Sequence, residues 1–337
     1  MAWTIFLQLT EIRAMKTVQL SCLALCVVLL GCESATRDTG SGRTPVQVQL
    51  NWFPESEHGG LFQALAEGNY VAQGMDVTIQ AGGRETPIGP ELVLERAQFA
   101  IANADDVIIF REQGMDVVAV MAAMQNHPRC ILARQDSGVD SFDDLAGKTL
   151  QRQAGRAYVE FMRSKGILEG VQEVPYHGSI ASLVGDPNIL IQAYSCAEPL
   201  LARQQGIAVN TLMVSDLGFN PYSSVLVTTG KLIKEEPELV RRFVDVTRAG
   251  WRRYLSDGAK GNAAILAVNE KGMTAEALEF GAATMRGLAM PDGASTETVG
   301  MMTSDRWNEL FRQLEQLDLV DAGKVDVEEC YTLDFLK

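Results

Sequence analysis

Aromatic and acidic side chains follow several apolar runs of this chain, where they could contact a flat, nitrogen-containing ring. An aromatic face can stack on such a ring, and a carboxylate can accept hydrogen bonds from its amino groups. The aromatic candidates are Trp52, Phe53, Tyr194 and Tyr222, and the acidic candidates are Asp105, Asp106 and Glu198. Helix capping competes for these acids: Asp is a favoured N-cap, and Ser195 with Glu198 fits a capping box.

Two arginines, a glycine and an asparagine are further candidate ligand-binding residues. Arg152 and Arg156 lie in a loop predicted over residues 151–156, where a guanidinium near a helix start could bind an anion. A solvated basic loop explains them equally well. Gly59 would let the backbone approach a ligand, and Asn103 directly precedes the acidic pair. For Trp52, packing against a core or hairpin is the common alternative, although its place at a strand end favours a ligand.

The elements that would position these residues alternate between strands and helices. Strands are predicted over residues 46–50, 74–79, 98–106 and 117–121, and helices over 60–67, 90–95 and 107–113. This alternation is typical of a parallel sheet covered on both faces. Ligands of such sheets bind beyond the carboxyl ends of the strands. The aromatic and acidic candidates stand at those ends.

Two apolar segments, 129–134 and 225–229, bracket a self-contained α/β stretch and are predicted to cross between two lobes. The first lobe would comprise residues 46–128 and 223–337, and the second lobe residues 129–222. Helices predicted beyond residue 237 would cover the first lobe. The expected fold class is α/β, with each lobe a mainly parallel sheet covered by helices and the lobes joined by two crossing strands.

The N-terminal region predicts a lipoprotein signal peptide over residues 1–31. Lys16 precedes an apolar run, 18–30, that is shorter than the ~20 residues of a spanning helix. The run ends in Leu-Leu-Gly-Cys, a lipobox pattern in which Cys32 would be diacylated, and residues 32–45 form a flexible tether. An ordinary signal peptide or a membrane anchor is the alternative, and the start at Met1 or Met15 stays open.

Composition excludes several functions. The formal charge of −14 argues against nucleic acid, because no basic patch could displace phosphate counterions. Beyond the leader, Cys130, Cys196 and Cys330 form no C-x-x-C, and the three histidines show no zinc spacing. No G-x-S-x-G elbow occurs. We therefore expect no metal, no cofactor and no catalytic residue.

A longer motif begins at Leu50. The segment LNWFPESEHGGLFQALAEGNYVAQGMDV resembles the L-[DN]-W-x-P-x-x-x-H-x-x-[LI]-[YF]-x-A-x-x-x-G-[YF] opening of binding proteins for thiamine pyrimidine precursors and of a fungal pyrimidine synthase. His58 is the histidine of that motif. Nitrate, taurine and alkanesulfonate binding proteins are more distant relatives. The resemblance extends from about residue 46 to the C-terminus and implies the type II periplasmic binding protein fold.

The resemblance implies a monomeric solute-binding protein of an ABC importer, lipid-anchored on the periplasmic side of the cell envelope. Its partners would be a small-molecule ligand, the permease and the membrane. An aminopyrimidine is the favoured ligand, while Arg152 and Arg156 leave nitrate, taurine and sulfonates open. An enzyme like the fungal synthases is the second reading, although their reactive His and Cys-rich run have no counterpart here. A surface adhesion or structural lipoprotein is the third.

Overall fold

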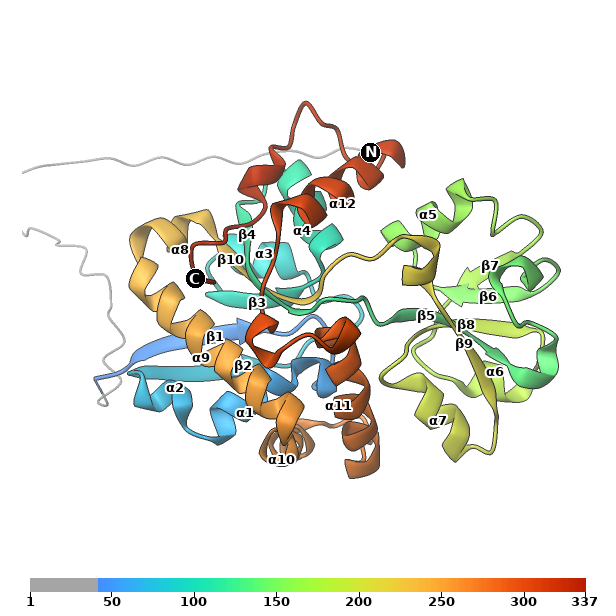
Figure 1. Ribbon diagram of the computed structural model, residues 1–337, viewed down its shortest axis with the longest axis horizontal. Coiled ribbons are helices and arrows are strands. Elements are labelled where there is room, and N and C mark those ends of the chain that lie inside the picture. The colour runs from blue at the N-terminus through green and yellow to red at the C-terminus, as the bar shows by residue number, and fades with distance from the viewer. Residues whose placement is uncertain (1–41) are drawn as a thin grey trace, which may run out of the picture. The chain divides into compact units, whose positions relative to one another are not determined.

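The computed structural model describes residues 42–337, so the predicted signal peptide, Cys32 and most of the tether lie outside the described residues. Two five-stranded sheets, seen apart in Figure 1, organise the described chain. The first sheet has the order β2 (Met75–Gln80), β1 (Thr44–Gln49), β3 (Phe99–Ala102), β10 (Ser223–Thr229), β4 (Val117–Met124). The second has the order β7 (Gln172–Pro175), β6 (Thr149–Arg152), β8 (Ile189–Tyr194), β5 (Arg129–Arg134), β9 (Val209–Met213).

Each sheet is mainly parallel with one antiparallel strand. β1 runs parallel to β2 and β3, and β6 runs parallel to β7 and β8. The antiparallel strands are β10 in the first sheet and β5 in the second. Every residue of β3 and β4 is buried, because their apolar sequences FAIA and VVAVMAAM are covered on both faces. The predicted α/β fold class is confirmed.

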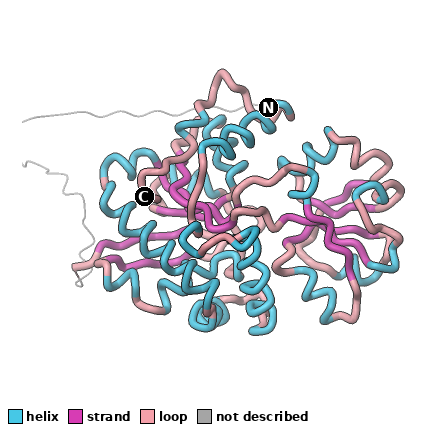
Figure 2. The backbone as a smooth tube through the Cα atoms, in the orientation of Figure 1, coloured by secondary structure: helices cyan, strands magenta, loops and turns pink. Residues whose placement is uncertain are grey.

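Helices surround both sheets, as Figure 2 shows. They are α1 (Gly59–Ala66), α2 (Asn69–Ala72), α3 (Ile88–Val93), α4 (Ala104–Glu112), α5 (Ala157–Ser164), α6 (Ala181–Gly185), α7 (Glu198–Gln204), α8 (Gly230–Glu235), α9 (Pro237–Ser256), α10 (Ala259–Val268), α11 (Ala275–Ala289) and α12 (Ser304–Gln316). The long α9 packs its apolar stripe on the first sheet, where Phe243 stacks on Phe99 at 4.0 Å between ring centroids. None of the helices within residues 42–337 combines the length and apolarity that crossing a membrane requires.

The chain passes between the sheets twice. Residues 129–134 and 225–229, predicted as crossing strands, lie within the sheets as β5 and within β10. The crossing itself is made by the short segments 125–128 and 218–222. Asn220 ties these segments together: its Oδ1 accepts the His127 N–H at 2.8 Å, and its side-chain amide donates to Asn126 Oδ1 at 2.9 Å. The boundaries of the two lobes stay a prediction.

Candidate functional site

The main cavity, of about 380 Å³, lies where the strand ends of both sheets face one another. The first sheet contributes Asn51 and Trp52 after β1 and Asn103 and Asp106 after β3. The second contributes Gln153 and Arg156 after β6, and Tyr194 and Glu198 at the end of β8 and the start of α7. Parallel strands of both sheets therefore point their carboxyl ends at one site, as expected for ligand clefts of open α/β folds.

Six of the residues predicted from the sequence line this cavity: Trp52, Asn103, Asp106, Arg156, Tyr194 and Glu198. Trp52 is half-buried and meets Phe53 edge-on, at 5.3 Å between ring centroids. Phe53 itself lines a neighbouring cavity. Asp105 lies behind the main cavity, in a space of about 10 Å³ near the connection between the sheets. The aromatic and acidic groups predicted to act together are thus largely assembled.

His58 and Gly59 have structural positions instead. The His58 ring is fully buried, and burial lowers its pKa to about 3. Its Nδ1 accepts the Glu55 N–H, so the neutral ring carries its proton on Nε2 and donates it to Asn51 Oδ1 at 2.9 Å. At Gly59 a Cβ would lie 2.1 Å from the Tyr254 ring. This glycine lets α1 pack against α9 rather than a ligand approach the backbone.

Arg152 and Tyr222 also point elsewhere. Arg152 belongs to strand β6, not to the predicted loop, and its Nε donates to Glu173 Oε2 at 2.8 Å. Tyr222 is 2% exposed, and its hydroxyl accepts the Thr303 N–H at 3.0 Å. The Arg306 guanidinium lies 3.9 Å from the Tyr222 ring centroid. Both residues are held by neighbours within the described chain and do not line the cavity.

Two carboxylates that the sequence analysis missed, Glu55 and Glu57, also line the cavity, beside Glu198. Burial raises the pKa of Glu57 to about 7, against the opposing charge of Arg129. Burial, followed by repulsion from Glu57 and Glu198, raises the pKa of Glu55. Burial also raises the pKa of Glu198, although this carboxylate accepts the Tyr194 N–H at 2.8 Å. These acids would gain most from donors on a ligand.

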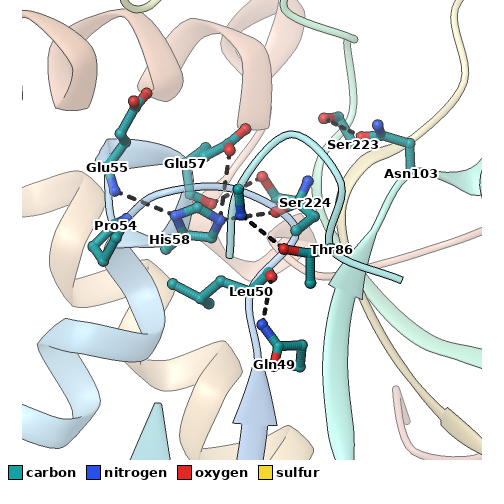
Figure 3. Close-up of polar contacts among 12 residues, drawn as sticks. Gln49, Leu50, Pro54, Glu55, Glu57, His58, Thr86, Asn103, Ser223 and Ser224 are labelled. Atoms are coloured by element: carbon teal, nitrogen blue, oxygen red, sulfur yellow. Dashed lines mark hydrogen bonds and ion pairs between the residues drawn. The ribbon is translucent and has the colours of Figure 1, made fainter. Parts of the chain in front are cut away.

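A short turn, η1 (Ser56–His58), fixes the two missed acids. The Glu57 carbonyl accepts a hydrogen bond from the Ser224 hydroxyl at 2.9 Å, and Ser224 adopts a left-handed φ of 48° within β10. In Figure 3 the Glu55 and Glu57 side chains extend to the same side of this loop. Glu57 Oε1 lies 3.5 Å from His58 Nε2, but the neutral histidine gives it no compensating charge. The turn therefore directs two carboxyl groups at the cavity, and its own histidine does not offset their charge.

Arg129, the first residue of β5, is the third missed residue. Its guanidinium lies 4.3 Å from the Tyr194 ring centroid and 5.2 Å from that of Tyr158. Those two faces hold the charge by cation–π interactions, and no carboxylate or carbonyl of residues 42–337 accepts a hydrogen bond from the guanidinium. Its donors are thus available to a carbonyl or ring nitrogen of a ligand.

Asn103 and the two aspartates form a polar junction after β3. Asn103, rather than either aspartate, is the N-cap of α4, and Asp106 Oδ2 accepts the Asn103 N–H at 3.3 Å. Asp106 Oδ1 meets Arg156 Nη1 at 3.3 Å, so this ion pair joins the two sides of the cavity. Burial, reinforced by Asp106, raises the pKa of Asp105 to about 7. Its Oδ1 has no hydrogen-bond partner in the described chain.

The predicted capping box of Ser195 and Glu198 is wrong. Ala197 is the N-cap of α7, and the Ser195 hydroxyl has no partner within the described chain. Glu198 instead accepts from the Tyr194 N–H and, at 3.3 Å, from the Tyr176 hydroxyl. A carboxylate held by two donors at a cavity wall keeps a fixed orientation toward the space. The structure therefore moves Glu198 from a helix-capping role to the cavity.

The two sheets, their double connection and the cavity between their strand ends are those of the periplasmic binding protein fold. The periplasmic aliphatic sulphonate binding protein SsuA from Escherichia coli has this fold: its structure covers 85% of this chain and 91% of its own, with a TM-score of 0.63 and 14% identity. Residues 55–259 match the family described as "NMT1/THI5 like", and the chain belongs to that family. The family match and the shared fold confirm the resemblance noted at Leu50.

Three relatives share recognisable sequence. The riboflavin-binding protein RibY of Chloroflexus aurantiacus is 27% identical over 221 residues, which are 61% of this chain and 61% of that protein. The formylaminopyrimidine-binding protein of Halalkalibacterium halodurans is 23% identical, over 68% of this chain and 72% of its own. The 4-amino-5-hydroxymethyl-2-methylpyrimidine phosphate synthase of Legionella pneumophila subsp. pneumophila is 20% identical, over 87% of this chain and 93% of its own.

Proposed function

We propose that this chain is the substrate-binding protein of an ABC importer and that it captures a planar nitrogen heterocycle, such as a thiamine pyrimidine precursor, between its two sheets. The observation that carries this proposal is the opposition of donors and acceptors around one cavity. Arg129 offers N–H groups that no acceptor within residues 42–337 binds, while Glu55 and Glu57 offer carboxyl groups from the first sheet's side. Trp52 and Tyr194 supply aromatic faces. A flat ring with both amino and carbonyl or aza positions matches this set.

Nitrate and simple sulfonates fit less well. Nitrate and a sulfonate group have no N–H donor to offer Glu55, Glu57 and Glu198, which line the cavity, and Arg156 is already engaged with Asp106. A synthase-type enzyme is the second candidate, since one relative carries that name. The region after β3 holds Asn103, Asp105 and Asp106 and no histidine, so the reactive residue associated with the fungal synthases has no counterpart there.

The proposal includes the setting of the protein. Acylated Cys32 would hold a monomer on the periplasmic side of a membrane, where the permease recognises the closed form. The lobes would comprise residues 46–128 with 223–337, and residues 129–222, hinged at the paired segments joined by Asn220. Closure buries the ligand between strand ends of both lobes. This arrangement needs no chemical step.

A ligand screen tests the proposal. The mature protein is melted with 4-amino-5-hydroxymethyl-2-methylpyrimidine, formylaminopyrimidine, riboflavin, nitrate, taurine and alkanesulfonates. A ligand at 100 times its Kd adds about 2.7 kcal/mol to the free energy of unfolding. We expect a heterocycle, and no anion, to raise the melting temperature, with calorimetry giving one site per chain. Stabilisation by nitrate or a sulfonate alone, or turnover of the heterocycle into a new product, would replace this function with one of its alternatives.

A further inference from the structure

The main cavity has an apolar end in addition to the polar residues described above. Five apolar residues line this end: Pro87, Ile88, Pro90, Phe110 and Met115. They come from the start of α3, from α4 and from the turn before β4, all on the first sheet's side. Ile88 is buried, whereas Pro90, Phe110 and Met115 are half-buried and keep part of their apolar surface accessible.

Helix α4 leads from the polar residues to the apolar end. Asp106, Phe110 and Gln113 all line the cavity, and their helical spacing places them on one face of α4. At a rise of ~1.5 Å per residue, this face extends the cavity by roughly 10 Å along the helix, which is longer than one six-membered ring. A single ring bound at the polar residues therefore leaves the apolar end unfilled.

Gly89 of α3 fixes the apolar wall. A Cβ on Gly89 would lie 2.4 Å from Met115 Sδ and 3.3 Å from Phe110 Cδ1, so the missing side chain lets both residues pack closely against α3. The Met115 N–H also donates to the Phe110 carbonyl at 2.9 Å. The wall is therefore held in place by its own packing.

The polar residues near the apolar end are engaged or directed elsewhere. The Thr86 hydroxyl accepts the Gly83 N–H at 2.8 Å. Arg84 is exposed and extends toward the loop after β7, where a Cβ on Gly178 would lie 3.7 Å from Arg84 Cδ. Gln113 is exposed at the end of α4. A polar substituent against the apolar wall would lose water without gaining a partner, whereas an apolar one would remove apolar surface from water.

We propose that the apolar end is a subsite for an alkyl or aryl group, which the ligand carries beyond the hydrogen-bonding edge of its heterocycle. This subsite rests on the proposed function, because it extends the same ligand. It adds a selection that the polar residues do not make: among heterocycles with the same donors and acceptors, the protein favours the one with the apolar substituent. The flexible Met115 side chain lets the wall adapt to the shape of that group.

Calorimetry with 4-aminopyrimidine and its derivatives tests the subsite. The parent ring is compared with its 2-, 5- and 6-phenyl derivatives, which sample each ring position, and with the carboxamides at the same positions. We expect at least one phenyl derivative to bind about tenfold or more tightly than the parent, since the phenyl group buries apolar surface. An equal gain from a carboxamide overturns the apolar character of the subsite.

Two further outcomes separate the subsite from the proposed function. If the parent or another heterocycle of the screen binds but no phenyl derivative gains affinity, the subsite is overturned and the proposed function stands. If none of these pyrimidines and none of the screened heterocycles binds, both proposals are overturned.

Variants locate the effect. Met115→Gln replaces the thioether with an amide of similar length and should reduce the ratio of phenyl-derivative to parent affinity severalfold. Gln113→Leu extends the apolar wall at an exposed position and should raise that ratio. Leu94→Gln, 59% exposed at the end of α3 and outside the cavity, is the matched control and should leave the ratio unchanged. A ratio that neither Met115→Gln nor Gln113→Leu alters would withdraw the subsite.

Discussion

Glu57→Gln tests whether the buried acids at the cavity are held at a cost to the fold. The Glu57 side chain is buried in the first sheet's loop, and its pKa rises from the ordinary 4.5 to about 7. One pKa unit corresponds to 1.36 kcal/mol. Above pH 7 the charged carboxylate therefore lowers the free energy of unfolding by about 3 kcal/mol. Glutamine has nearly the shape of the protonated acid and lacks this cost.

The sign of the pH dependence follows from proton counting. Between pH 4.5 and about 7 the folded protein holds the Glu57 proton more strongly than the unfolded chain does. Stability from this group therefore falls as pH rises through that window and stays low above it. We expect Glu57→Gln to be close to wild type near pH 4.5 and more stable at pH 8, the gain growing by about 2 to 3 kcal/mol between pH 5 and pH 8.

Urea unfolding of the ligand-free mature protein, followed by tryptophan fluorescence at pH 5, 6, 7 and 8, measures the difference. Glu55, Glu198 and Asp105 also titrate, but they are present in both proteins. Glu279→Gln, at an exposed position on α11, is the control and should give a flat difference across this range. Parallel curves for Glu57→Gln and wild type, or a loss of stability at pH 8, would refute the assignment of a buried carboxylate whose charge destabilises the fold.

Four further expectations follow from the site and the leader. Trp52→Ala should weaken heterocycle binding by one to two decades in calorimetry, since a stacking contact is worth ~1–3 kcal/mol, and should leave the ligand-free melting temperature nearly unchanged. Arg129→Gln should cost ~1.5–3 kcal/mol of affinity by removing charged donors, and titration should show a higher pKa for Glu57. Cys32→Ser should release the protein from membranes on fractionation, with the diacyl mass lost. Small-angle scattering should show compaction when the heterocycle binds; an unchanged curve with bound ligand contradicts the hinge.

The strands were predictable because their apolar patterns are local. Residues 189–194 match β8, and the expected strand over 46–50 is β1, shifted by one or two residues. Trp52 and Asn103 were predicted at the cavity because both follow recognisable parallel strands, and ligands of such sheets bind beyond the strand ends. This rule gave no warning of Arg129, because β5 is antiparallel to its neighbours and its amino end, not its carboxyl end, faces the site.

Gly59 and Glu57 show why the rest needed the structure. A glycine at a helix start permits close approach of either a ligand or another helix. The position of Tyr254, far along the chain, shows that Gly59 accommodates helix packing. A glutamate in a loop is ordinarily solvated. Glu57 is buried because Ser224, 167 residues later, holds its carbonyl beneath the cavity. Such a contact leaves no periodic pattern in the local sequence.

Several energetically unfavourable features of the described chain lie at the cavity. Within residues 42–337, three acids with raised pKa values, an aspartate oxygen without a hydrogen-bond partner and a guanidinium without an acceptor lie within or beside it. Buried polar groups left unsatisfied cost stability, and a fold selected only for stability would replace them with apolar or paired residues. A ligand with matching donors and acceptors can form hydrogen bonds with the Asp105 oxygen, the Arg129 guanidinium and the free lone pairs of the acids. These residues lower the stability of the ligand-free protein. The hydrogen bonds that they form with a bound ligand can offset that loss.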